Sequence, residues 1–182
     1  MVLRQPLSEA ISEGDAISML VHVRGAGEAV AAEAAGAEGI KTNGVVEGLR
    51  AATMLPILVA GVTPEDASRS GADAWLLVAE TDADALEQRY ALARELGLEC
   101  VVDVRDDEEL ELVLTRIDPE IVLLSPRAAE RDEDAVDRVL ELLPDVPAGK
   151  LVAAELMTPS AAGVTALESA GVDAVLVGPD AM

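Results

Sequence analysis

Four ionisable side chains, His22, Arg24, Lys41 and Asp103, interrupt or follow short apolar runs of the sequence. His22 is the one histidine among 182 residues, and an imidazole can take up or release a proton near neutral pH. A lysine among apolar neighbours can have its pKa lowered into the same range. Arg24 stays charged, so it would bind a carboxylate or phosphate rather than donate a proton. These residue types predict acid–base chemistry on a small anionic molecule.

The four side chains are carried by a unit that recurs along the chain. Each unit is a short apolar run, then a polar, alanine-rich stretch of helical period, and then a glycine. Runs that are apolar throughout suit parallel strands covered on both faces, and their spacing fits one strand, one helix and two short loops. The eight runs are 17–23, 39–42, 56–60, 74–79, 99–104, 121–125, 151–154 and 174–178.

Eight β-α units without a break in composition predict an α/β fold, a single (β/α)8 TIM barrel domain over residues 1–182. The carboxyl ends of the strands meet at one mouth in such a barrel. Residues two apart on a strand point to the same face, so His22 and Arg24 share a face.

Helix punctuation supports the same fold. Thr63-Pro64 and Thr158-Pro159 each predict a capping threonine followed by a proline at the first helical position. Four glycines stand where a helix should have just ended, namely Gly36, Gly71, Gly97 and Gly171.

The barrel is predicted to be shortened. The chain ends at Met182, soon after the last apolar run, so the helix that follows strand 8 in a full barrel is lacking. The outer face of strands 8 and 1 then needs another cover. Residues 7–12 as a short helix are one candidate, and a homo-oligomer contact through this face is the other.

The charge balance limits the classes of partner. The chain carries 35 acidic and 13 basic side chains, a net charge of −22. An acidic surface repels phosphate backbones, which argues against nucleic acid as a partner. Lys41 and Lys150 are the only lysines, a composition typical of a protein that stays soluble in a salty cytoplasm.

No run is long enough to cross a bilayer, and the amino terminus has no signal or transit pattern, so we expect a cytoplasmic protein without a membrane partner. Cys100 lies in an apolar run, which predicts a buried thiol. The acidic run 106–109 should open a helix, where consecutive carboxylates do not share a face. We therefore expect no metal site and no cofactor.

Three longer stretches, 71–80, 96–110 and 168–182, resemble indole-3-glycerol-phosphate synthase, the (β/α)8 barrel of tryptophan biosynthesis. The resemblance covers about residues 50–182 and is weaker from 17 to 50. The family's long N-terminal extension is lacking, and the loop after strand 3 is shorter. The resemblance implies a carboxy-lyase that closes an indole ring from a carboxyphenylamino ribulose phosphate, with loss of carbon dioxide and water. It also implies a lysine as general acid, glutamates as acid–base groups, and backbone amides around the phosphate.

Carried over by this resemblance, the family's general-acid lysine on strand 3 falls at Ala60. The glutamate and lysine of strand 1 fall at His22 and Arg24, and the glutamate of strand 5 falls at Asp103. By register with the family's second strand, Lys41 points toward the mouth.

On strand 6 the resemblance aligns an asparagine with Ser125 and keeps the arginine as Arg127. The glutamate of strand 7 is kept as Glu155, and the glycine of strand 8 as Gly178. The resulting candidates are catalytic His22, Lys41, Asp103 and Glu155, and substrate-binding Arg24, Ser125, Arg127 and Gly178, with a phosphorylated small molecule as ligand.

Three neighbouring positions weaken the phosphate site that the resemblance implies. Leu156 and Met157 replace a serine and a glycine, which adds bulk, and Pro179 has no N–H to donate.

Three functions follow. The first is a divergent lyase of this type, in which His22 or Lys41 replaces the missing lysine. The second is a non-catalytic barrel that binds a partner or a small anion, its charged residues closed into a salt-bridge network around His22. The third is a lyase or isomerase acting on another phosphorylated sugar. Ala60 favours the second function, whereas Arg127, Glu155 and Gly178 favour the first.

Overall fold

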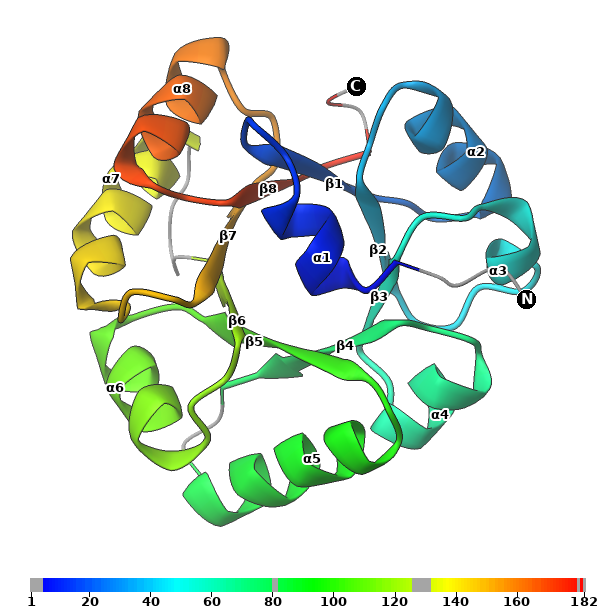
Figure 1. The fold of residues 1–182 in the computed structure, drawn as a ribbon, viewed down its shortest axis with the longest axis horizontal. Coiled ribbons are helices and arrows are strands. Elements are labelled where there is room, and N and C mark those ends of the chain that lie inside the picture. The colour runs from blue at the N-terminus through cyan, green and yellow to red at the C-terminus, as the bar shows by residue number, and fades with distance from the viewer. Residues whose placement is uncertain (1–4, 80–81, 126–131, 180, 182) are drawn as a thin grey trace.

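The computed structural model describes residues 5–79, 82–125, 132–179 and 181, with no account of the side chains of 132 and 133. Eight parallel strands close into a barrel in sequence order, as predicted (Figure 1). The strands are β1 (Ser18–His22), β2 (Gly39–Asn43), β3 (Ile57–Ala60), β4 (Ala74–Val78), β5 (Glu99–Val104), β6 (Ile121–Leu124), β7 (Leu151–Leu156) and β8 (Ala174–Val177).

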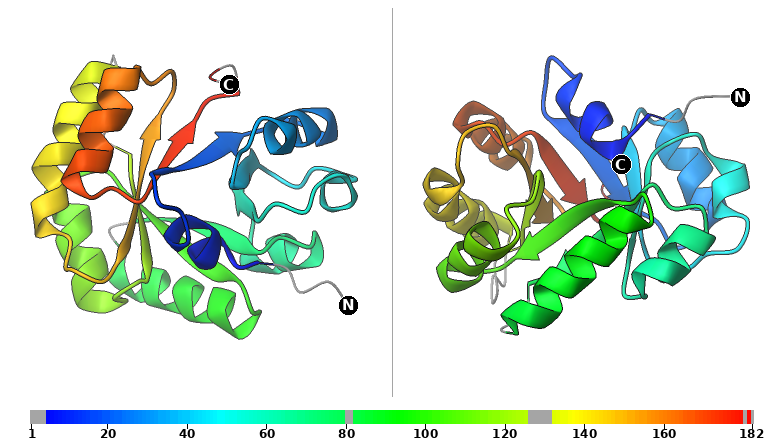
Figure 2. Two further views of the ribbon diagram at one scale, coloured as in Figure 1. Left: turned by 45° about the horizontal axis from the view of Figure 1, so that its top comes forward. Right: turned by 60° about the horizontal axis from the view of Figure 1, so that its bottom comes forward.

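Helices follow the first seven strands and surround the barrel (Figures 1 and 2). Residues 178, 179 and 181, which follow β8, are not helical. The surrounding helices are α2 (Ala26–Ala34), α3 (Leu49–Ala52), α4 (Pro64–Arg69), α5 (Ala83–Glu95), α6 (Asp107–Arg116), α7 (Asp132–Leu142) with the 3₁₀-helix η1 (Leu143–Asp145), and α8 (Ala161–Ala170).

The apolar side chains form two separate layers because residues along a strand alternate between two faces. One layer fills the barrel lumen and includes Leu20, Leu58 and Leu123. The other lies between the strands and the helices and includes Leu77 and Val102, which are 2% and 0% exposed. Apolar runs without alternation are therefore explained by strands buried on both faces.

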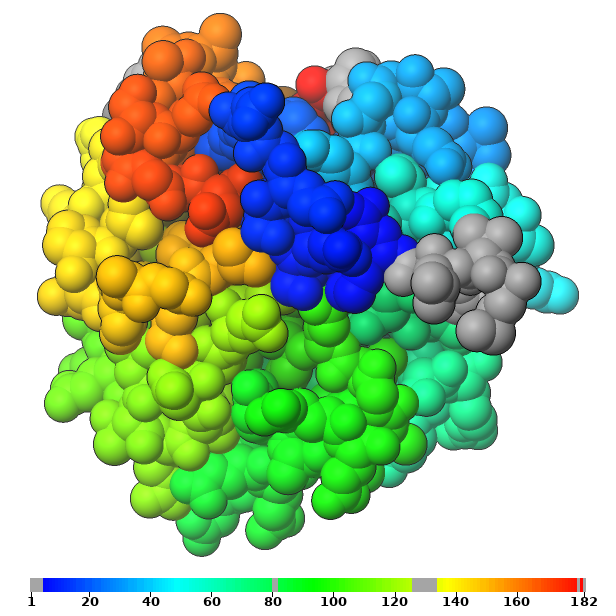
Figure 3. Space-filling view, in the orientation of Figure 1, coloured from blue at the N-terminus to red at the C-terminus, as the bar shows by residue number. Residues whose placement is uncertain are grey.

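The segment 7–12 forms the predicted helix, α1 (Leu7–Ser12), but the expectation that it covers the outer face of strands 8 and 1 was wrong. Leu7 and Ile11 are buried in the lumen layer, one helical turn apart. The hydroxyl of Ser18, the first residue of β1, donates to the Ile11 carbonyl. The helix thus closes the amino-terminal end of the barrel, where it fills the centre of the face in Figure 3.

A carboxylate at the amino-terminal end of the lumen binds the start of α1. Glu99, the first residue of β5, accepts the backbone N–H groups of Leu7 and Ser8. These N–H groups have no partner within the helix, and a negative charge at that end is favourable. An open, apolar barrel end is therefore a better site for this helix than the outer wall.

The outward-facing side chains of β8 and β1 are buried, whereas the sequence predicted an uncovered face. Val175 and Val177 of β8 are 0% and 1% exposed, although residues 178, 179 and 181, which follow this strand, are not helical. Val21 of β1 is buried in the same outer layer. A homo-oligomer through this face stays a prediction.

Most of the helix signals are confirmed. Thr63 caps α4 with Pro64 in its first turn, and Asp106 caps α6 at the start of the acidic run. The four predicted glycines all have positive φ. The α8 helix differs: Ser160 and not Thr158 caps it, because the Ser160 hydroxyl accepts the Gly163 N–H at 3.0 Å.

Three further findings concern the described residues alone. None of their helices is long and apolar enough to span a membrane. No group of three or more of their histidine, cysteine and carboxylate side chains is placed to hold a metal ion. Cys100 is buried as predicted, and burial raises the pKa of its thiol to about 12.

Candidate active site at the barrel mouth

The lumen of the barrel is apolar along most of its length and becomes polar at the carboxyl ends of the strands. Leu20 and Val101 face the lumen, and residues two apart on a strand point to the same side. The residues two positions later, nearer the carboxyl ends of the strands, therefore also face the lumen, and these are polar. That end of a TIM barrel carries its functional groups. The polar layer consists of His22, Lys41, Asp103, Ser125 and Glu155.

Lys41 and Glu155 form the central contact of this layer. Lys41 Nζ lies 3.2 Å from Glu155 Oε1, and the two side chains are 10% and 32% exposed. The contact joins β2 to β7 across the mouth. The expected orientation of Lys41 is therefore what the structure has, and the ammonium is buried with its charge matched by a carboxylate.

Asp103 and Ser125 lie together on the neighbouring strands β5 and β6. The Ser125 hydroxyl donates to Asp103 Oδ1. Burial raises the pKa of the Asp103 carboxyl, more strongly than the hydrogen bond from Ser125 lowers it, and the charge of Glu155 raises it further. Asp103 is thus shifted toward its protonated form, in which it can donate a proton.

His22 lies beside Lys41, because the two residues are register partners on β1 and β2. Burial lowers the pKa of His22, and the positive charge of Lys41 lowers it further. The imidazole is therefore biased toward its neutral form, which can accept a proton. His22 and Asp103 are shifted in opposite directions, as a base and an acid in one site would need.

Arg24 forms an ion pair with a glutamate of the helix that follows β1. Its guanidinium pairs with Glu28 in the first turn of α2, with 3.0 Å from Nε to Oε1, and its side chain is 63% exposed at the rim. The hypothesis of one closed network that includes Arg24 stays a prediction. Arg127 lies outside the described residues.

Gly178 is needed for a close approach of the chain to itself. Its N–H donates to the Met157 carbonyl at 3.1 Å, and a Cβ at this position would lie 2.7 Å from the same oxygen. This N–H therefore already has a protein partner, and Met157 occupies the space in front of it. That Met157 weakens a phosphate site here stays a prediction.

Ala60 faces the lumen at the carboxyl end of β3, where its register partner is Asn43 of β2. The position is 6% exposed. The structure thus puts a methyl group where the resemblance places the general-acid lysine, and the nearby buried ammonium is that of Lys41, on the adjacent strand.

Arg105 was missed by the reasoning from sequence. It follows Asp103 by two residues, and its guanidinium donates to the Ala79 carbonyl at 3.1 Å from Nη2 and pairs with Glu109 at 3.3 Å. The signal was present, because residues two apart on a strand share a face.

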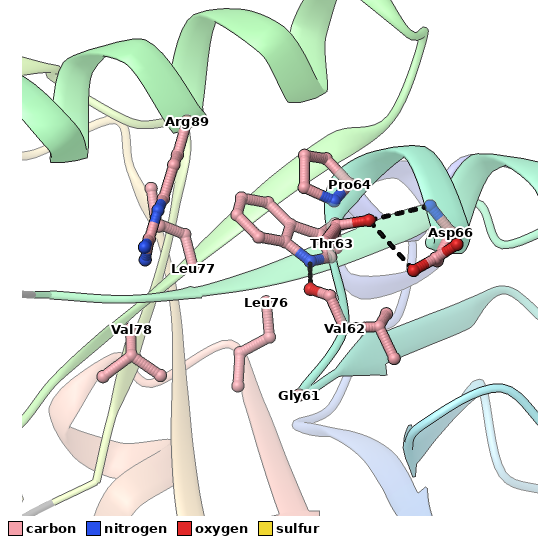
Figure 4. A pocket seen from close by; sticks show the side chains of 10 residues that line it. Gly61, Val62, Thr63, Pro64, Asp66, Leu76, Leu77, Val78 and Arg89 are labelled. Atoms are coloured by element: carbon pink, nitrogen blue, oxygen red, sulfur yellow. Dashed lines mark hydrogen bonds between the residues drawn. The ribbon is translucent and has the colours of Figure 1, made fainter.

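A cavity of about 580 Å³ lies at the wall of the barrel between α4 and α5 (Figure 4). Pairing of β3 with β4 ends at Val59 and Trp75, so the upper part of β4 separates from β3 there. Trp75 packs in the outer layer, and its indole N–H donates to the Val62 carbonyl at 2.9 Å. The cavity is distinct from the ion pair in the lumen.

Comparison with solved structures shows the fold. An N-acetylmannosamine-6-phosphate 2-epimerase from Clostridium perfringens matches with a TM-score of 0.77 at 14% identity, covering 98% of this chain and 91% of that one. A putative phosphonomutase from Burkholderia cenocepacia matches with a TM-score of 0.61 at 19% identity, covering 90% of this chain and 86% of that one. At these identities the likeness concerns architecture alone.

Sequence comparison reaches further. An indole-3-glycerol phosphate synthase from a Geobacillus species is 32% identical over 146 residues, which are 77% of this chain and 57% of the relative. That of Shouchella clausii is 33% identical over 119 residues, 65% of this chain and 47% of the relative. That of Burkholderia vietnamiensis is 35% identical over 139 residues, which are 73% of this chain and 53% of the relative.

The chain thus spans about half the length of these curated relatives. The family model for indole-3-glycerol phosphate synthase matches residues 61–182, which carry β4 to β8 and the Asp103 and Glu155 side of the mouth. This chain belongs to the indole-3-glycerol phosphate synthase family.

Proposed function

We propose that this barrel is a carbon–carbon lyase of the family's type, acting on a phosphorylated sugar derivative, and that Lys41 serves as its proton donor. The observation that carries the proposal is the buried contact of Lys41 Nζ with Glu155 Oε1 at 3.2 Å, at the mouth of the barrel. An ammonium in this place lies one strand from Ala60, the position at which the resemblance puts the family's general-acid lysine.

The neighbouring groups support a division of roles. A ring-closing condensation that releases water needs a proton donor at the oxygen that leaves, and a base that accepts a proton elsewhere. Lys41 can donate a proton, the raised pKa of Asp103 favours a donor role for its carboxyl, and the lowered pKa of His22 favours an acceptor role for its imidazole. Glu155 holds the Lys41 ammonium in position. After Lys41 has donated its proton, Glu155 can accept a proton from solvent and pass it to the Lys41 amine.

The anionic part of the substrate would be held differently from the phosphate site that the resemblance implies. The Gly178 N–H already bonds to the Met157 carbonyl, and Pro179 has no N–H. Cationic side chains at the rim, Arg24 among them, are better suited to hold a phosphate here.

A non-catalytic barrel that binds a small anion is the second candidate. Ala60 favours this candidate, because alanine cannot serve as the general acid that the resemblance puts at this position. The hydrogen bond from Gly178 to Met157 also favours it, because it occupies a backbone N–H that could otherwise bind phosphate. Lys41 and Glu155 would then serve as a structural ion pair.

The test is turnover in high salt. The purified chain is incubated with carboxyphenylamino deoxyribulose phosphate, and indole fluorescence is followed in the wild type, Lys41→Met and Lys150→Met. Lys150 is the matched control, because its side chain is also 10% exposed but pairs with Asp118 near the amino-terminal end of β7. The proposal predicts turnover in the wild type and Lys150→Met and its loss, by about 100-fold or more, in Lys41→Met.

Equal turnover in all three proteins would overturn the role of Lys41. A wild type without turnover that still binds a reduced substrate analogue, and loses this binding in Lys41→Met, would establish the second candidate in its place.

A further inference from the structure

Ser125 lies directly after β6, and the pairing of β6 with β5 fixes its place. Leu124, the last residue of β6, is the register partner of Val104 on β5, and the Ser125 N–H donates to the Val104 carbonyl at 3.0 Å. Leu123 is the register partner of Asp103 and packs in the lumen layer. Ser125, two positions after Leu123, therefore also faces the lumen. Strand pairing thus brings the Ser125 hydroxyl to the carboxyl of Asp103.

The Ser125 hydroxyl has one proton to donate, and it donates this proton to Asp103 Oδ1. The resemblance aligns Ser125 with an asparagine, whose amide carries two N–H donors. An asparagine could hold a neighbouring side chain with one N–H and a ligand with the other. A serine that donates to a carboxyl has no second proton for a ligand.

The cations near Asp103 are bonded to other groups. The guanidinium of Arg105 donates to a backbone carbonyl of the β4 end and pairs with a glutamate of α6. The Lys41 ammonium lies 3.2 Å from Glu155 Oε1. Within the described part of the chain, the hydrogen bond to the Asp103 carboxyl comes from the hydroxyl of Ser125 and not from a cation.

A neutral donor suits a carboxyl that gains and loses a proton. A bonded guanidinium or ammonium strongly favours the charged form of a carboxyl. A hydroxyl that donates to Oδ1 leaves Oδ2 able to hold a proton, because a protonated carboxyl still accepts hydrogen bonds. Burial and the charge of Glu155 raise the pKa of Asp103, and the hydrogen bond from Ser125 lowers it. This bond therefore orients the carboxyl in both protonation states.

We propose that Ser125 is a positioning residue, which orients the Asp103 carboxyl for proton transfer at Oδ2 and does not bind the ligand. This role replaces the substrate-binding role that the resemblance implies for Ser125. The inference rests on the proposed function, because that function gives the Asp103 carboxyl its donor role. Its first test nevertheless follows the carboxyl itself and needs no turnover.

The first test titrates Asp103 by NMR of the side-chain carboxyl carbons, with Asp103→Asn to identify its signal. In Ser125→Ala the midpoint should rise, because the hydrogen bond that stabilises the charged form is lost while burial and the charge of Glu155 remain. Lys41 and Arg105, whose charges lower the pKa of Asp103, are the same in both proteins. Ser125→Thr keeps a hydroxyl and should restore the wild-type midpoint.

Ser70→Ala is the matched control. Ser70 is also partly buried and also donates its hydroxyl, to the Ala67 carbonyl at 2.7 Å, but it lies at the carboxyl-terminal end of α4. Its loss should leave the Asp103 midpoint unchanged. Thermal unfolding of each variant identifies any that fails to fold. If Ser125→Ala does not fold, Ser125→Cys provides the comparison, because a thiol is similar in shape but a weaker donor, and the midpoint should rise there too.

The second test uses turnover to separate positioning from ligand binding. Ser125→Ala should lower kcat by about tenfold and leave KM within about twofold of the wild type, because the carboxyl spends less time in the productive orientation. In an Asp103→Asn background the same substitution should cause no further loss, since Ser125 acts through that carboxyl. Ser125→Thr should recover most of kcat.

An Asp103 midpoint that is the same in the wild type and Ser125→Ala would overturn the proposal. So would a raised KM with an unchanged kcat in Ser125→Ala, which would make Ser125 a ligand-binding residue. A midpoint that depends on the Ser125 hydroxyl in a protein without lyase turnover would support the positioning role and contradict the proposed reaction. Turnover that depends on Lys41, with an Asp103 midpoint independent of Ser125, would do the reverse.

Discussion

Lys41 on β2 and Glu155 on β7 form an ion pair across the mouth of the barrel, with 3.2 Å between Nζ and Oε1. The two residues are 114 positions apart in the chain, and no helix or hairpin connects them directly. Their contact depends on closure of the barrel, because only then do β2 and β7 face each other across the lumen. A pair placed in this way should contribute to the stability of the closed barrel.

The contribution of this pair to stability should be measurable in a double-mutant cycle. Lys41→Met and Glu155→Gln should show a coupling of about 1–2 kcal/mol in the free energy of unfolding, between the values for surface and buried pairs, because the Glu155 side chain is 32% exposed. Urea unfolding of the two single variants and the double variant gives this number. For Lys150 with Asp118, whose side chain is 79% exposed, the coupling should stay below about 1 kcal/mol. A coupling near zero for Lys41 with Glu155 would contradict the assignment.

His22 should titrate below the ordinary histidine pKa of 6.5, because burial and the charge of Lys41 disfavour its protonated form. As the chain's one histidine, it can be followed by NMR without assignment of other imidazoles. The midpoint should rise in Lys41→Met, which removes a positive charge, and fall in Glu155→Gln, which removes a negative one. A midpoint that neither variant moves would show that His22 is remote from the pair.

The lowered pKa of His22 also fixes the sign of its effect on stability. Between the folded and the unfolded pKa, the unfolded chain binds more protons, so the contribution of His22 to the free energy of unfolding falls as the pH drops below about 6.5. The variant His22→Gln should lose this part of the pH dependence in urea unfolding experiments.

Gly178→Ala should be destabilising by about 1–3 kcal/mol, because a Cβ would lie 2.7 Å from the Met157 carbonyl oxygen and would force the two backbone segments apart. Thermal or urea unfolding measures the loss. Gly27→Ala in α2 is the control: nothing lies within 4 Å of its added Cβ, and alanine is the better helix former, so it should be neutral or stabilising by up to about 1 kcal/mol. Similar effects for the two variants would mean that the approach at Gly178 is not tight.

Glu99→Gln should loosen α1, because it removes the negative charge that binds the N–H groups of Leu7 and Ser8. We expect a loss of about 1–2 kcal/mol in the free energy of unfolding and faster hydrogen exchange in residues 7–12. Glu120→Gln, at an exposed position near the same end of the barrel, should change neither. Unaltered exchange in Glu99→Gln would show that Leu7 and Ile11 alone hold the helix in the lumen.

Local patterns in the sequence were sufficient for the elements of this fold. Runs apolar on both faces have one stable setting, a parallel sheet covered on both sides, and the glycines and the Thr63-Pro64 pair mark where helices stop and start. Alternation along each strand also predicted that His22 and Arg24 share a face, since it follows from backbone geometry with period two.

The tertiary structure alone decided which partners these residues have. By its sequence, the segment Leu7–Ser12 could pack on an outer wall or at an open barrel end, and the contacts with Glu99 and Ser18 hold it at the barrel end. Arg24 pairs with Glu28, four residues later in the chain, and a contact this close in sequence costs little entropy to order. Contacts between residues far apart in the chain, such as Lys41 with Glu155, exist only after the ring of strands closes, and a sequence carries no local signal for them.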